Sequence, residues 1–154
     1  AGVDGMPQDA NERVANVRKV MEAVISAGIP LSDVYIDCLV FPISVSPKYG
    51  RDYLDAVSEI RDLYGPEVHI TGGLSNVSFG LPMRKLINDT FIYLSLEAGI
   101  DTGIIDPVQS NIAEIFNLDV DSEPVRLARE MLLGEDEFCV NYLKAWRAGR
   151  LKIR

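Results

Sequence analysis

Hydrophobic residues alternate along this chain between a spacing typical of helices and runs typical of buried strands. Residues 11–27 and 49–64 carry apolar side chains three and four positions apart, which places them on one face of a helix. Between these segments, residues 34–41 (VYIDCLVF) are almost all apolar and rich in β-branched and aromatic types. Such a run is typical of a strand buried on both faces. The pattern therefore predicts a helix, a strand and a second helix in this order.

The same alternation continues along the chain. Residues 68–78 and 102–106 predict a second and a third strand, and the acidic residues 119–123 predict a loop. Further helices are predicted over residues 86–98, 125–133 and 138–148. Strands that alternate with helices form βα units and a parallel sheet, either doubly wound or closed into a barrel. The spacing of Gly72 and Gly73 does not fit Gly-x-Gly-x-x-Gly, which disfavours a dinucleotide-binding fold.

Composition and charge narrow the range of functions. The chain has 154 residues, of which 47% are hydrophobic and 25% charged, as in one globular domain. A formal net charge of −8 argues against nucleic acid or an anionic membrane surface as a partner. No apolar run approaches the roughly 18 residues of a membrane span, and two cysteines make no disulfide scaffold, so we expect a cytoplasmic protein. The chain begins at Ala1 rather than Met, and we expect it to be a segment of a longer protein.

Polar residues lie at the carboxyl ends of the predicted strands, where parallel α/β folds build their sites. Asp37 lies in the first strand, where a carboxylate is costly unless it is paired or binds a ligand. The alternative is that Asp37 caps a neighbouring loop or pairs with a structural arginine. Ser75 and Asn76 end the second strand, although both residue types also form turns. Asp106 precedes Pro107 at the end of the third strand, so it equally suits the start of a helix.

Other residues carry weaker signals. Gly72 and Gly73 inside a strand predict the close approach of a ligand or another backbone. His69, the only histidine, lies near the amino end of its strand and is expected to be structural. Cys38 and Cys139 are expected to be buried apolar residues, and no His or Cys cluster has the spacing of a metal site.

Three motifs between residues 73 and 101 resemble a known family. Residues 73–78 (GLSNVS) are followed by residues 84–88 (RKLIN) with Phe91, and then by residues 98–101 (AGID). In this order and spacing they resemble the methyltetrahydrofolate:corrinoid-protein methyltransferases. That family shares a pterin-binding barrel with the folate domain of cobalamin-dependent methionine synthase and with dihydropteroate synthase.

The resemblance covers almost the whole chain and implies a fold. Residues 34–37 (VYID) are similar to the family's sixth strand, and residues 5–7 (GMP) with Arg13 are similar to the loop after the fifth. The implied fold is α/β, a (β/α)8 TIM barrel of the pterin-binding type. Residues 1–154 would supply about strands six to eight and the surrounding helices, as the carboxyl-terminal part of one domain. A barrel needs about 250 residues, so three strands cannot close, and their edges are exposed or paired with another chain.

The resemblance also implies roles for single residues. Asp37 corresponds to the aspartate that binds the pterin ring, and a carboxylate suits two parallel N–H groups. Asn76 corresponds to the catalytic asparagine that contacts N5, where a hydrogen bond that strengthens as charge builds on N5 lowers the barrier. The other implied substrate-binding residues are Gly73, Ser75, Arg84 and Ile104. Asp106 lies beside this site without a firm role, and no metal ligand is implied.

The implied reaction is methyl transfer from N5 of methyltetrahydrofolate to cobalt(I) of a corrinoid protein, or the reverse. Methyltetrahydrofolate or tetrahydrofolate is then the substrate, the partner protein carries the cobalamin, and we expect a homodimer. A dihydropteroate synthase-like enzyme is one alternative, disfavoured because residues 75–77 (SNV) replace the Ser-Arg-Lys of that enzyme. The other alternative is a non-catalytic pterin-binding or oligomerisation fragment that becomes active only with the missing half.

Overall fold

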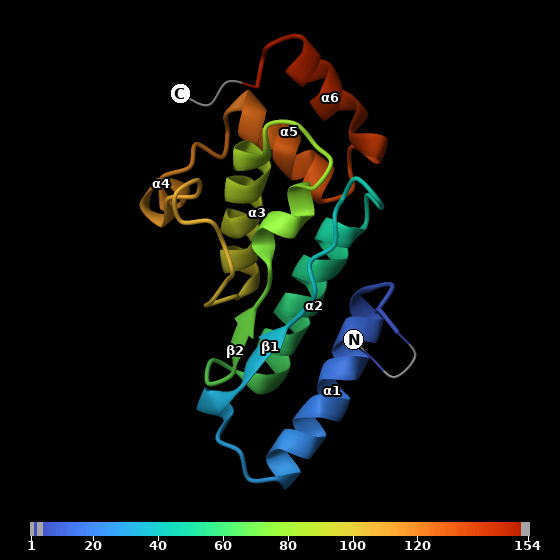
Figure 1. The fold of residues 1–154 in the computed structure, drawn as a ribbon, viewed down its shortest axis with the longest axis vertical. Coiled ribbons are helices and arrows are strands. Elements are labelled where there is room, and N and C mark those ends of the chain that lie inside the picture. Colours follow the sequence, from blue (N-terminus) through green and yellow to red (C-terminus); the bar gives the residue numbers. More distant parts are fainter. Residues whose placement is uncertain (1, 3–4, 152–154) are drawn as a thin grey trace.

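The chain folds into an α/β unit that consists mostly of helices packed beside a small parallel sheet (Figure 1). The structure is a computed structural model that describes residue 2 and residues 5–151. The α-helices are α1 (Ala10–Ser26), α2 (Tyr49–Tyr64), α3 (Arg84–Ala98), α4 (Ile112–Phe116), α5 (Glu123–Leu132) and α6 (Val140–Arg147). The strands are β1 (Tyr35–Asp37) and β2 (His69–Thr71), and short 3-10 helices are η1 (Leu31–Asp33), η2 (Leu74–Ser78) and η3 (Glu137–Cys139).

The helices follow the predictions closely, because each is bounded by a clear local signal. The bounds of the five predicted helices differ from the observed ones by at most two residues. At the start of α1 the Asp9 side chain accepts a hydrogen bond from the Glu12 N–H, and at the end of α2 Gly65 adopts a φ of 72°. Glu123 opens α5, so the acidic loop ends one residue before its predicted boundary.

The sheet is shorter than predicted. β1 and β2 pair in parallel over three residues each, with Tyr35 opposite His69 and Asp37 opposite Thr71. The predicted third strand is represented by a single parallel bridge between Gly73 and Ile104. Residues 102–104 therefore run beside β2 on the side away from β1.

The prediction that the first strand is buried on both faces was wrong. Ile36 is buried, but its neighbours Tyr35 and Asp37 are exposed. Ile70 of β2 is likewise buried, and it lies in register with Ile36. The helices thus cover one face of the sheet, while the described part of the chain supplies no layer for the other face.

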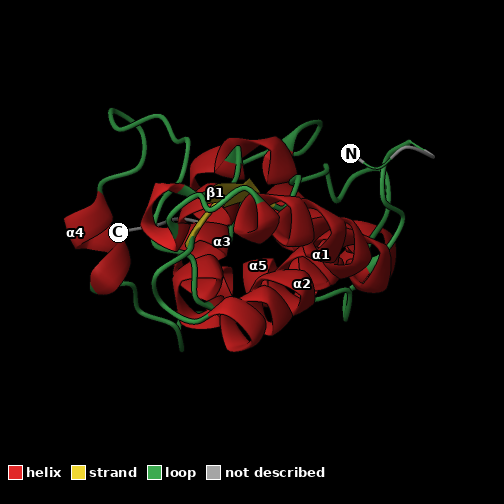
Figure 2. Cartoon of the chain, turned by 90° about the horizontal axis from the view of Figure 1, so that it is seen from below, coloured by secondary structure: helices red, strands yellow, loops and turns green. Residues whose placement is uncertain are grey.

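Three helices form the layer behind the sheet. α1 packs against α2 and α2 packs against α3, and Figure 2 shows the three lying side by side. The hydrophobic core between them includes Met21, Ile60 and Phe91, each at most 1% exposed. α5 packs against both α3 and α6, as the orange and red end of the ribbon in Figure 1 shows.

One open edge accompanies the uncovered face. A groove of about 170 Å³ runs along β1 beside α1, and Val17, Val20, Tyr35 and Asp37 are among the residues that line it. In the described part of the chain, the two short strands, the segment bridged to Gly73 and the unpaired edge of β1 are what a part of a parallel barrel would show. No helix in the described residues combines the length and the apolar character needed to cross a membrane.

Candidate functional site

The loops after β1 and β2 lie at the same edge of the sheet. Because β1 and β2 are parallel and in register, the segments that follow them leave the sheet at the same end, the carboxyl end of the strands. The loops are also bonded to each other, since the Ile43 N–H donates to the Val77 carbonyl at 3.1 Å. This edge therefore brings the segment after Asp37 close to η2, which contains Asn76.

At this edge, one of the two carboxylate oxygens of Asp37 accepts a hydrogen bond from the protein. The side chain is exposed, and its Oδ1 accepts a hydrogen bond of 2.8 Å from the Leu39 N–H. Within the described residues, the second carboxylate oxygen accepts no hydrogen bond from the protein. Asp37 thus combines a loop-capping role with an acceptor that remains available to a ligand. No arginine among the described residues pairs with Asp37, so the predicted alternative of a structural arginine finds no support there.

Asn76 lies in η2 with its amide over Gly73. A Cβ at Gly73 would come within 3.0 Å of the Asn76 Nδ2, so the missing side chain of Gly73 makes room for the amide. The main chain of Asn76 forms the turn, with its N–H donating to the Gly73 carbonyl at 3.0 Å. Its side-chain amide, in contrast, makes no hydrogen bond to the described residues. Asn76 can therefore form the turn with its main chain and still offer its side-chain amide to a ligand.

Arg84 braces η2 from the first turn of α3. Its Nη2 donates to the Ser75 carbonyl at 3.0 Å, and its Nε donates to the Ser78 Oγ at 2.9 Å. The guanidinium also lies over the Phe79 ring, 4.7 Å from the ring centroid. Arg84 is itself exposed, so it holds the turn in place while one side remains open to solvent.

Ile104 and Asp106 occupy different surroundings from each other. Ile104 is bridged to Gly73 and is 68% exposed, so it offers an apolar surface beside η2. Both carboxylate oxygens of Asp106 are used locally, by the Val108 N–H at 3.0 Å and the Gln109 side chain at 2.8 Å. Asp106 closes a turn and does not begin a helix, because α4 starts later and has Asn111 as its N-cap.

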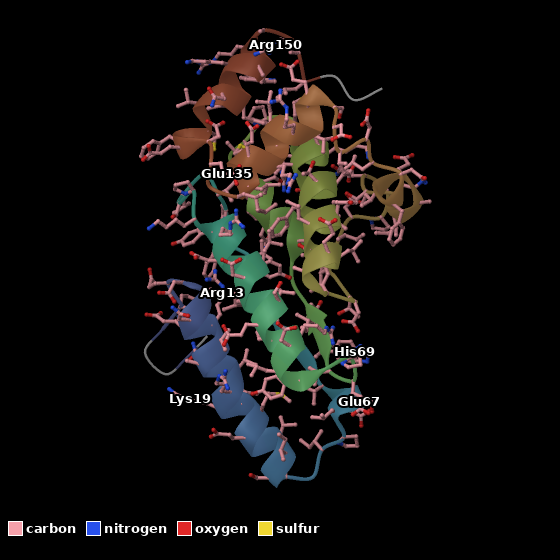
Figure 3. All side chains as sticks on the ribbon, turned by 180° about the vertical axis from the view of Figure 1, so that it is seen from behind. Arg13, Lys19, Glu67, His69, Glu135 and Arg150 are labelled. Carbon is pink, nitrogen blue, oxygen red and sulfur yellow. The ribbon has the colours of Figure 1, made fainter. Side chains whose placement is uncertain are left out.

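Arg13 is a buried cation beside Asp37 that the sequence analysis left without a role. Only 2% of the residue is exposed, and it lines the same groove as Asp37. Burial lowers the pKa of Arg13, which the negative charge of Asp52 partly opposes. Arg13 belongs to the motif that resembles the loop after the family's fifth strand, but its spacing in the sequence does not indicate that the side chain is buried. Figure 3 shows it in the first turns of α1.

Neither cysteine is built as a nucleophile. Cys38 and Cys139 are buried and free. Burial, with the nearby charge of Asp37, raises the pKa of the Cys38 thiol to about 12, so the thiol stays protonated at neutral pH. The prediction of two buried apolar cysteines is confirmed.

His69 lies at the amino end of β2, away from the candidate site. Its ring stacks on Tyr35 with centroids 4.5 Å apart, and its Nδ1 lies 2.6 Å from the Asp101 Oδ2. Figure 3 shows His69 next to Glu67 and far from Arg13. The structural role expected for this histidine agrees with these contacts. Among the residues that the structure describes, no three His, Cys, Asp or Glu side chains are grouped to hold a metal ion.

Comparison with known proteins places this arrangement in a family. The family described as "Pterin binding enzyme" matches residues 3–106, which include β1, β2, η2 and Ile104. The chain belongs to the pterin-binding enzyme family. The resemblance seen in the motifs is thereby confirmed, and a barrel of the TIM type is the fold that this family implies.

Named relatives agree with the family. The chain is 32% identical over 148 residues to the methylcorrinoid:tetrahydrofolate methyltransferase of Eubacterium limosum, covering 96% of this chain and 50% of that protein. It is 33% identical over 108 residues to the methionine synthase of Mycobacterium leprae, covering 66% of this chain and 9% of that protein. The methionine synthase of Mycobacterium tuberculosis matches at 32% over 108 residues. The chain thus spans about half the length of the first of these relatives and a small part of the other two.

Proposed function

We propose that this protein exchanges a methyl group between N5 of tetrahydrofolate and the cobalt of a corrinoid carried by a partner protein. The observation that carries the proposal is a pair of unengaged polar groups at one sheet edge. Within the described residues, the second oxygen of Asp37 and the amide of Asn76 have no protein partner. The names of two relatives support this reaction: one is a methylcorrinoid:tetrahydrofolate methyltransferase and the other a methionine synthase.

Asp37 would hold the pterin ring. An aminopyrimidine edge presents N–H donors, and a carboxylate accepts such donors more strongly than a neutral oxygen. Because Oδ1 is already held by the Leu39 N–H, the direction of the second oxygen is set before the ligand arrives. Gly73, Ser75, Arg84 and Ile104 would complete the contacts, with Ile104 supplying an apolar wall.

Asn76 would assist the displacement itself. Transfer to the corrinoid breaks the bond between N5 and the methyl carbon, leaves its electron pair on N5, which takes up a proton, and joins the carbon to cobalt(I) through the electron pair of the metal. A donor N–H aimed at N5 stabilises the charge that changes there during the transfer. An amide donates this hydrogen bond at any pH, and the described protein groups do not compete for it.

The same proposal extends to the whole protein. We infer that residues 1–154 are part of one pterin-binding barrel domain, since the family match, the short parallel sheet and its open edge all fit a partial barrel. A homodimer is proposed from the resemblance alone, and the molecular mass in solution tests it. Two free, buried cysteines support a reducing, cytoplasmic setting.

The test is methyl transfer between methyltetrahydrofolate and reduced cobalamin, measured in both directions with the intact protein. Replacing Asn76 with Ala should lower kcat about 100-fold, as the loss of one stabilising donor does in other enzymes. The matched control is Asn141→Ala, an exposed asparagine of α6, which should leave kcat unchanged. An Asn76→Ala variant as fast as wild type would contradict the role of Asn76. Binding of methyltetrahydrofolate by wild type without methyl transfer would instead identify a non-catalytic pterin-binding protein.

A further inference from the structure

Arg13 is held almost entirely by main-chain carbonyls. Its guanidinium donates to the carbonyls of Asp9 at 3.0 Å, Cys38 at 3.0 Å and Leu39 at 3.4 Å. It also lies over the Phe41 ring, 5.0 Å from the centroid. In the part of the chain that the structure describes, Arg13 forms no ion pair. Buried arginines are ordinarily paired with a carboxylate, so the arrangement of this one calls for a reason.

The carbonyls that Arg13 binds flank a residue in an unfavourable conformation. Leu39 has a φ of 59°, in the left-handed region where the Cβ of a side chain approaches the following carbonyl. A residue other than glycine remains there only when its surroundings hold it. The Cys38 carbonyl precedes the Cα of Leu39 and the Leu39 carbonyl follows it. A guanidinium that binds both therefore restrains the two backbone angles between them.

The conformation of Leu39 in turn sets the direction of Asp37. The Leu39 N–H donates to the Asp37 Oδ1 at 2.8 Å, so the carboxylate turns with the peptide that carries this N–H. We propose that Arg13 is a positioning residue, which aims the Asp37 carboxylate at the pterin by holding Leu39 in its left-handed conformation. This inference rests on the proposed function, in which Asp37 binds the pterin ring.

The proposal predicts an effect on binding and not on the chemical step. Asp37 would contact the pterin ring, whereas Asn76 would contact N5, where the bond breaks. Loosening Asp37 should therefore weaken the affinity for methyltetrahydrofolate while kcat changes little. A purely structural role of Arg13 would lower stability and would not separate Kd from kcat in this way.

The principal experiment replaces Arg13 with Lys in the intact protein. A lysine keeps the charge but replaces three separate donor nitrogens with one, so it cannot hold the Asp9, Cys38 and Leu39 carbonyls in the same geometry. The Kd for methyltetrahydrofolate should therefore rise about tenfold, with kcat within about twofold of wild type. The matched control is Arg18→Lys on the same helix, where the side chain forms an exposed ion pair with Glu59 at 3.3 Å. This control should bind methyltetrahydrofolate as wild type does.

A second substitution tests the route through Leu39. Glycine adopts positive φ without a steric cost, so Leu39→Gly added to Arg13→Lys should bring the Kd back toward the wild-type value. If Arg13→Lys does not fold, Phe41→Leu removes the ring beneath the guanidinium, together with its edge-on contact to Tyr49, and should raise the Kd about threefold. An unchanged Kd in a folded Arg13→Lys or Phe41→Leu variant, or no recovery in the double variant, would overturn the proposal.

Failure of this inference differs visibly from failure of the proposed function. If wild type does not bind methyltetrahydrofolate, or if Asp37→Asn binds it as tightly as wild type, the proposed role of Asp37 is wrong. If Asp37→Asn weakens binding but Arg13→Lys does not, Asp37 keeps its role and only the positioning by Arg13 is wrong.

Discussion

Asp101 and Asp37 are the same residue type, but different hydrogen-bond partners give them different roles. Asp101 accepts hydrogen bonds from the Ile70 N–H at 2.9 Å and from Arg61 at 3.4 Å, and it lies 2.6 Å from His69. Both oxygens of Asp101 are therefore engaged by the protein, whereas one oxygen of Asp37 accepts no hydrogen bond from the described residues. The first residue ties the amino ends of the strands together, and the second is suited to a ligand.

Replacing Asp101 with Asn should change how stability depends on pH. Partial burial alone would raise the pKa of Asp101, but the hydrogen bonds from Ile70 and His69 and the charge of Arg61 outweigh it, so the pKa lies below its ordinary value. A lowered pKa stabilises the fold above the unfolded pKa of about 4, and this contribution is lost as pH falls through the folded value. Asp101→Asn should lower the urea midpoint at pH 7 and flatten its fall as the pH drops below about 4.

The control for Asp101→Asn is Asp62→Asn, an exposed side chain of α2. Its urea midpoints should follow those of wild type at each pH. A wild-type pH dependence in Asp101→Asn would show that the contacts of Asp101 contribute nothing to stability.

At the scale of elements, helices and strands were predictable to different degrees. The apolar spacing and the bounding residues of a helix are local, which is why α2 was predicted at its observed bounds. The length of a strand depends on its neighbours. β1 has a paired neighbour on one side only within the described residues, and η2 turns the predicted second strand aside after Thr71. Periodicity alone contains no information on either effect.

The candidate site was predictable in position but not in detail. Asp37 and Asn76 were identified from the rule that parallel sheets carry sites at their carboxyl ends and from the resemblance. The clamp of Arg13 on the Leu39 segment depends on carbonyl oxygens, and carbonyls are present in every residue and carry no sequence signal. The brace of Arg84 on Ser75 and Ser78 was hidden for the same reason.

The junction between β2 and η2 offers a matched pair of substitutions. A Cβ at Gly72 would lie 2.8 Å from the hydroxyl of buried Tyr53, so Gly72→Ala should destabilise the fold by about 1–3 kcal/mol. A Cβ at Gly73 would instead meet the Asn76 Nδ2 at 3.0 Å, and Gly73 has a φ of −76° that alanine adopts readily. Gly73→Ala should therefore leave the free energy of unfolding within about 1 kcal/mol of wild type.

Gly73→Ala, which should hardly change stability, should nevertheless lower the rate of methyl transfer. Displacing the Asn76 amide by a fraction of an ångström or more should lower the rate of Gly73→Ala about tenfold or further. Denaturant unfolding and methyl-transfer assays on both variants provide the measurement. Equal losses of stability in the two variants, or full activity in Gly73→Ala, would contradict the arrangement of Asn76 over Gly73.

At the scale of the whole molecule, the candidate site joins segments that are distant in sequence. Asp37 is the last residue of β1, Asn76 lies after β2, and Ile104 belongs to the bridged segment beside β2. Beneath them, the face of the sheet with Tyr35 has no covering layer in the described residues, and Tyr35 is 60% exposed. A ligand that contacts all three segments would add cross-links where the described chain has few contacts of its own.

Methyltetrahydrofolate should therefore stabilise the fold as a whole. A ligand that binds only the folded state raises the free energy of unfolding by about 2.7 kcal/mol at a concentration 100 times its Kd. The unfolding temperature should rise with ligand concentration in wild type. The rise should require higher concentrations in Asp37→Asn, where the carboxylate that receives the pterin is lost. p-Aminobenzoylglutamate, which lacks the pterin, is the matched control ligand and should leave the unfolding temperature unchanged. An unchanged wild-type unfolding temperature at saturating methyltetrahydrofolate would mean that the three segments do not form one pterin site.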